Sequence, residues 1–282
     1  MTPEQKQSEL QRYKAILLAT LNYLEERFGG SIVFDQYDPT IEYYRQQKIQ
    51  TEKYFKQRRL DTLQQQLTNL TKGLQSRADL NFASYIKEKT GYEIDIFKNL
   101  QKCIGAIVAQ NEIRSQKELV DVSTMLHLYH VKAADDKEVE QLKSLLANYS
   151  KRTNEISGKT KSEYSEVISR VKKDGVEEVR VRISTGPKPK HFEEQEATSP
   201  DGKRKLRVVQ WGDSKHASTY VDIMFPTASG SVYGMSGIHK VRAFWKDNST
   251  IVIETPKNHS ANTQHKHVRS FDDVISIEYV EH

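Results

Sequence analysis

Five leucines between residues 60 and 74 recur with alternating spacings of three and four residues. They lie in a polar, helix-forming segment rich in Gln, Lys and Arg: Leu60, Leu63, Leu67, Leu70 and Leu74. This rhythm is typical of the narrow a/d seam of a coiled coil, whereas a helix on a globular core has a broader apolar stripe. Because a narrow seam is buried only against a partner helix, the sequence predicts long helices that pair.

A second run with the same rhythm follows at Val139, Leu142, Leu146 and Tyr149. We expect the two runs to pair, either within one chain that folds back or between copies. The composition agrees with this expectation. Of 282 residues, 36% are hydrophobic and 29% are charged, and the mean hydropathy is −0.73. That is polar for a single globule but natural for long helices, and the regular apolar spacing argues against disorder.

The period of the apolar pattern changes near residue 174. Residues 172–175 (Lys-Lys-Asp-Gly) are typical of a helix end, and Val179, Val181 and Ile183 then alternate with arginines as in a half-buried strand. Further strands are predicted at 206–211, 220–225, 241–245, 251–254 and 274–280, with loops at 186–201 and in the Gly/Ser-rich stretch 229–237. The predicted class is α+β. A helical, coiled-coil-containing domain (1–174) precedes a small, mostly antiparallel β-barrel or β-sandwich domain (175–282).

The cellular compartment is predicted from the low cysteine content, the polar first residues and the lack of a long apolar run. Cys103 is the only cysteine, so a disulfide framework is excluded and a reducing compartment is favoured. The first residues lack the charged-then-apolar build of a signal peptide. No apolar run approaches the roughly 18–20 residues that cross a bilayer. We therefore expect a cytoplasmic protein that has no membrane partner.

Basic residues are concentrated in two stretches of a chain whose net charge is +5. The first mixes cations with tyrosines and phenylalanine, which suits phosphate neutralisation and base stacking; its candidate nucleic-acid contacts are Arg45, Arg58 and Arg59. The second leads into a predicted strand and comprises Lys203, Arg204, Lys205 and Arg207. The alternatives are a solvated helix face for the first stretch and charged protection of an edge strand for the second.

Seven of the nine histidines lie at or after residue 191. Three of them, His259, His265 and His267, form a candidate set of metal ligands, because residues 265 and 267 share a face if the segment is extended. Their spacing is not diagnostic, and a polar loop with surface histidines is the alternative. No local motif marks a Ser-His-Asp or Cys-His arrangement.

These observations favour a non-enzymatic assembly or adaptor protein. Its helical region would mediate homo-oligomerisation, and its β-domain would bind a macromolecular partner, with nucleic acid favoured over protein. The alternative is a metal-dependent hydrolase or nuclease subunit that uses the C-terminal histidine cluster. The sequence names no cofactor.

Overall fold

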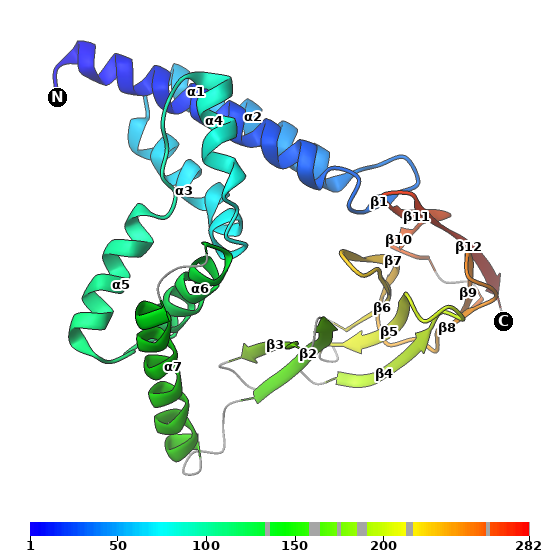
Figure 1. Ribbon diagram of the computed structural model, residues 1–282. Helices are drawn as coiled ribbons and strands as arrows, with labels where there is room; N and C mark the ends of the chain where they lie inside the picture. Colours follow the sequence, from blue (N-terminus) through cyan, green and yellow to red (C-terminus); the bar gives the residue numbers. More distant parts are fainter. Residues whose placement is uncertain are drawn as a thin grey trace. The chain divides into compact units, whose positions relative to one another are not determined.

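The computed structural model describes residues 1–132, 136–157, 164–173, 176–184, 191–212, 217–257 and 260–281 (Figure 1). Within these residues the chain is α+β, as predicted, with seven helices in its N-terminal part. The helices are α1 (Pro3–Phe28), α2 (Pro39–Lys56), α3 (Leu60–Ser76), α4 (Asn81–Thr90), α5 (Lys98–Gln110), α6 (Gln116–Lys132) and α7 (Asp136–Ser157).

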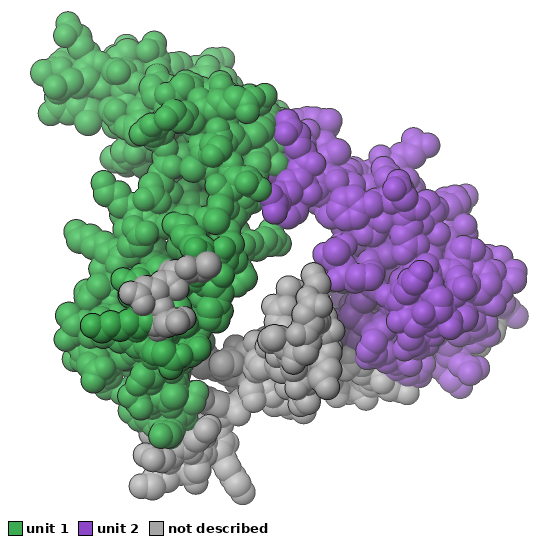
Figure 2. Space-filling model, in the orientation of Figure 1, with its two compact units in different colours: residues 1–23, 47–187 green, residues 24–46, 188–282 purple. Residues whose placement is uncertain are grey.

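The chain divides into two compact units (Figure 2). A helical unit comprises residues 1–23 and 47–187, and a sheet unit comprises residues 24–46 and 188–282. The sheet unit therefore includes the end of α1, the start of α2 and the connection between them, which lie far in the sequence from residues 188–282.

Most of the leucine run is buried on α3 inside the helical unit. The buried members are at most 8% exposed: Leu60, Leu63, Leu67 and Leu74. A buried hydrogen bond from Thr51 Oγ1 to Gln66 Oε1 (3.1 Å) also ties α3 to α2, and α3 contacts α6. The second run lies on α7, which packs on α5 and α6. The coiled-coil pairing of the two runs remains a prediction.

The sheet unit contains two five-stranded sheets. One has the order β1-β11-β12-β9-β8 and the other β10-β7-β6-β5-β4, and all neighbours are antiparallel except β12 and β9. The strands are β1 (Val33–Phe34), β4 (His191–Thr198), β5 (Lys205–Trp211), β6 (Ser218–Met224), β7 (Ser229–Ser236), β8 (Arg242–Trp245), β9 (Thr250–Thr255), β10 (Thr263–Gln264), β11 (His267–Ser270) and β12 (Asp273–Glu281).

Neither sheet closes on itself, so the predicted barrel alternative is wrong. A barrel needs unbroken strand pairing around its circumference, whereas each of these sheets ends in two edge strands, β1 and β8 in one and β10 and β4 in the other. Inward-facing side chains of both sheets nevertheless form a single apolar core, which includes Val221, Ile223, Ile251, Ile253 and Ile275.

The predicted end of the last helix at residues 172–175 is also wrong. Helix α7 ends at Ser157, and a strand, β2 (Tyr164–Lys173), pairs antiparallel with β3 (Val176–Ser184). The Asp-Gly pair that follows Lys173 suits a two-residue hairpin loop as well as it suits a helix end, and it lies outside the described residues. The β-branched residues of β2 favour a strand, and therefore a hairpin loop over a helix end.

The Gly/Ser-rich stretch predicted to be a loop is strand β7. Its glycines lie where aromatic rings cross the strand: a Cβ on Gly230 would lie 2.5 Å from Cζ of Phe34, and one on Gly234 would lie 2.9 Å from Cδ1 of Tyr220. These glycines therefore permit close packing and do not mark a turn. Sequence alone does not separate the two uses.

Candidate nucleic-acid interface

Arg204, a predicted nucleic-acid contact, is buried inside the sheet unit. Its Nε donates to Oδ2 of Asp273 (2.8 Å) and its Nη2 donates to Oδ2 of Asp201 (3.3 Å). Its Nη1 donates to the carbonyl oxygen of Asn248, and its guanidinium lies 5.9 Å from the ring centroid of Trp245. The residue is 8% exposed, so its charge is paired inside the sheet unit and is not presented to solvent.

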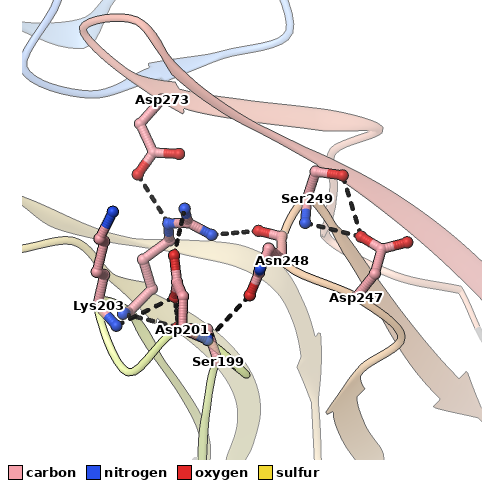
Figure 3. A network of polar contacts seen from close by, with 8 residues as sticks. Ser199, Asp201, Lys203, Asp247, Asn248, Ser249 and Asp273 are labelled. Carbon is pink, nitrogen blue, oxygen red and sulfur yellow. Dashed lines mark hydrogen bonds and ion pairs between the residues drawn. The ribbon is translucent and has the colours of Figure 1, made fainter.

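A network of short polar contacts holds the turn before β5 (Figure 3). Ser199 Oγ donates to Asp201 Oδ1 (2.7 Å) and accepts from the backbone N–H of Arg204 (3.0 Å). The backbone N–H of Asp201 donates to Oδ1 of Asn248 (2.9 Å), which joins this turn to the turn between β8 and β9. The Ser199 hydrogen bond, the N–H of Lys203 and the Arg204 charge lower the pKa of Asp201. The network therefore has a structural role: it holds the turn before β5 against the turn between β8 and β9.

The cations on β5 face carboxylates on the neighbouring strands. Lys205 forms an ion pair with Glu196 of β4, and Nη2 of Arg207 lies 3.3 Å from Oδ2 of Asp222 on β6. Both pairs follow from the register, in which each cation lies directly opposite or one row from its acid. Lys203 is exposed in the turn. The predicted basic cluster is thus largely neutralised by its own sheet.

Two of the three predicted metal-binding histidines contact Asp35, which lies in the connection between α1 and α2. His265 Nδ1 is 3.0 Å from Asp35 Oδ2, and His267 Nδ1 is 3.7 Å from Asp35 Oδ1. The backbone N–H groups of Lys266 (3.0 Å) and His267 (2.9 Å) also donate to Asp35 Oδ1. Partial burial acts to raise the pKa of Asp35, but the His265 hydrogen bond and these N–H groups together hold it below its ordinary value.

The same connection completes the first sheet. Strand β1 pairs antiparallel with β11, and the ring of Phe34 stacks on His265 with a centroid distance of 4.6 Å. Ile32 is 8% exposed and belongs to the sheet core. The histidines therefore have a structural use, which sequence reasoning missed because Asp35 is so distant along the chain. Within the described residues no group of three or more potential ligands can hold a metal; His259 lies outside them.

The predicted contacts of the first basic stretch have different surroundings. Arg45, on α2 in the sheet unit, forms an ion pair with Glu42 (2.6 Å). Arg58 and Arg59 lie in the helical unit, at the turn from α2 to α3, and both are exposed. Lys53 and Lys56, in the last turn of α2, are exposed as well. We call Lys53, Lys56, Arg58 and Arg59 the α2–α3 corner.

Backbone hydrogen bonds fix the shape of the α2–α3 corner. The N–H of Arg59 donates to the carbonyl of Tyr54 (3.0 Å), and the N–H of Arg58 donates to that of Phe55 (2.9 Å). This is the Schellman pattern, in which the residue after the helix adopts a left-handed conformation. Arg58 occupies that position with φ +54°. The corner is therefore a defined turn that places two adjacent arginines beyond the helix end.

Aromatic rings and the position of the acids complete the corner. The Arg59 guanidinium lies 5.3 Å from the ring centroid of Tyr54. Glu52, the acid nearest in sequence on α2, forms an ion pair with Lys14 of α1 (2.8 Å). Asp61 lies in the first turn of α3, where a carboxylate complements the helix dipole. The corner thus carries four cations, and Glu52, the nearest acid on α2, is paired with Lys14.

No protein-family model, curated protein or solved structure matches the chain. Among the helices of the described residues, none combines the length and the apolarity that crossing a bilayer requires. The function is therefore inferred from the residues and contacts given above.

Proposed function

We propose that the chain is a non-enzymatic assembly or adaptor protein that binds nucleic acid through the α2–α3 corner. The observation that carries the proposal is the exposure of Lys53, Lys56, Arg58 and Arg59 together on one helix end and its turn. Neutralising phosphates with such cations releases counterions, which is the main source of affinity for nucleic acids.

The chemistry of the α2–α3 corner suits a phosphate backbone more than a base edge. Guanidinium groups bind phosphate in a bidentate manner, and the Tyr54 ring beneath Arg59 helps to hold one guanidinium in place. The lysines add point charges within one helical turn. The expected binding is therefore salt-dependent and only weakly sequence-specific.

A purely structural role accounts for part of this surface. Lysines in the last turn of α2 complement the helix dipole. Arg58 is different, because a left-handed conformation costs a side chain about 1–2 kcal/mol, which glycine avoids. An exposed arginine at a position that favours glycine supports a use for its side chain.

The test is a titration of the full chain against labelled duplex DNA, single-stranded DNA and single-stranded RNA at several salt concentrations. The variant Lys56→Glu/Arg58→Glu should weaken binding at least tenfold. The slope of log K against log salt should also fall by about 0.9 per lost contact on duplex DNA and about 0.7 on a single strand.

A matched control is Lys203→Glu/Lys205→Glu, which reverses two cations in the other basic cluster. We expect its affinity to change less than twofold, because Lys205 already faces Glu196. Absence of binding to all three nucleic acids, or equal losses in the two variants, would overturn the proposal.

A further inference from the structure

Helix α2 carries an exposed isoleucine on the side that faces away from α3. Ile49 is 55% exposed, and among the described residues of the helical unit only Met1 is a more exposed large apolar side chain. Thr51, two residues further along α2, is buried and donates to Gln66 of α3. Because two residues turn a helix by about 200°, Ile49 lies on the opposite side of α2, toward solvent.

Ile49 shares its face of α2 with the two lysines of the α2–α3 corner. Lys53 follows Ile49 by four residues and Lys56 follows it by seven, which are the spacings of neighbours on one side of a helix. Seven residues of helix span about 10 Å, so one short stretch of a polymer can reach all three side chains. A single exposed apolar side chain is ordinary; its place beside the cations of the corner gives Ile49 a use.

The other end of the α2–α3 corner also joins a cation to an apolar surface. The guanidinium of Arg59 lies 5.3 Å from the ring centroid of Tyr54, and Tyr54 is half-buried. The ring helps to hold the guanidinium in place, and a guanidinium plane is itself a surface on which bases stack. The corner therefore combines its charges with two surfaces that suit a base, Ile49 and the Arg59 guanidinium.

We infer that the nucleic acid bound at the α2–α3 corner is single-stranded, an inference that rests on the function proposed above. A single strand exposes its bases, so its phosphates bind the four cations while unstacked bases pack on Ile49 and Arg59. A duplex encloses its bases and is contacted mainly through phosphates and sugars. Against a duplex, Ile49 would gain no base and would remove water from phosphates without compensation.

The test compares the affinity of the full chain for single-stranded DNA, single-stranded RNA and duplex DNA of equal length at one salt concentration, by fluorescence anisotropy. Each single strand should bind at least about fivefold more tightly than the duplex, which is the effect of one stacked base. Ile49→Gln keeps a helix-forming residue and should lower single-strand affinity by a similar factor. Its salt slope should stay the same, because no phosphate contact is lost, and its duplex affinity should change less than twofold.

The matched control is Val131→Gln, at a residue 49% exposed on α6, and it should alter none of these affinities. A second variant, Ile49→Trp, does not rely on a loss of binding. It should bind single strands more tightly, because an aromatic ring stacks on a base. Single strands should also quench its fluorescence beyond the change that the two natural tryptophans give in the unmodified chain.

Two outcomes would overturn the inference and leave the proposed function standing. One is a duplex affinity equal to or above the single-strand affinities, and the other is an equal effect of Ile49→Gln and Val131→Gln on single-strand binding. Absence of binding to all three nucleic acids would instead refute the proposed function, and the inference with it.

Discussion

The α2–α3 corner and the Lys203–Arg207 cluster have nearly the same composition but opposite surroundings. At β5 the neighbouring strands bring Glu196 and Asp222 opposite the cations. Arg204 lies between the carboxylates of Asp201, in the preceding turn, and Asp273 of β12. At the corner, Glu52, the nearest acid on α2, is paired with Lys14 of α1, and the four cations are exposed. The number of cations in a stretch therefore does not determine how many of them are available to a ligand.

The physical reason is that charges interact strongly only at short range, so the availability of a cation depends on the groups next to it in space. A cation next to a carboxylate must exchange that partner for a phosphate, so much of the gain is cancelled. In a helix, neighbours lie three or four residues away and are visible in the sequence. In a sheet, they lie on other strands, and only the register identifies them.

The largest expected effect concerns Arg204, the buried cation that is paired with two carboxylates. Arg204→Ala should lower the free energy of unfolding by roughly 2–4 kcal/mol, because it leaves Asp201 and Asp273 without their buried partner. Urea denaturation measures the change. Nucleic-acid affinity per folded molecule should stay the same; a loss of affinity with unchanged stability would instead make Arg204 a contact residue and erase the contrast.

The second prediction concerns a variant in which the Lys203–Arg207 cluster loses its carboxylate partners and so comes to resemble the α2–α3 corner. Glu196→Gln/Asp222→Asn removes the carboxylates that face Lys205 and Arg207. We expect a several-fold gain in affinity for nucleic acid and a steeper salt dependence, by about 0.9 per new phosphate contact on duplex DNA. Titration of duplex DNA at several salt concentrations measures both. An unchanged affinity would show that ion pairing with Glu196 and Asp222 is not what keeps this cluster from binding nucleic acid.

The third prediction concerns the pH dependence that Asp35 confers. Its pKa is held below the ordinary value of 3.8, chiefly by His265 against the opposing effect of burial. The stabilisation is therefore complete above the unfolded-state pKa and is lost as the pH falls through the lower folded-state pKa. Asp35→Asn should lower stability by less than 1 kcal/mol near neutral pH, and its stability should fall less on acidification. Thermal melts between neutral pH and pH about 3 compare the two proteins.

The smallest expected effect separates strain from function at the corner. Arg58→Gly relieves the left-handed backbone at the cost of greater freedom in the unfolded chain, so stability should rise by a few tenths of a kcal/mol or stay level. Nucleic-acid binding should weaken all the same. Ala78→Gly, at another left-handed residue that follows a helix, serves as the control and should leave binding unchanged.

Much of the secondary structure could be predicted from the sequence, because local patterns report local structure. The strands around Val208, Val221 and Ile253 appear where alternation placed them. Strand β7 could not be predicted, since Gly230 and Gly234 are needed by rings of Phe34 and Tyr220 from other segments. The contact of His265 with Asp35 also could not be foreseen, because it joins residues at opposite ends of the chain.

The sequence by itself determined the helical first part, the sheets that follow and the two basic stretches, since propensity, periodicity and charge are properties of neighbouring residues. Tertiary structure alone decided which cations remain available, which histidines bind a carboxylate and which segment completes the first sheet. The reason is that burial and ion pairing depend on distances in space, and strand register and chain reversal set those distances between residues that are remote along the chain.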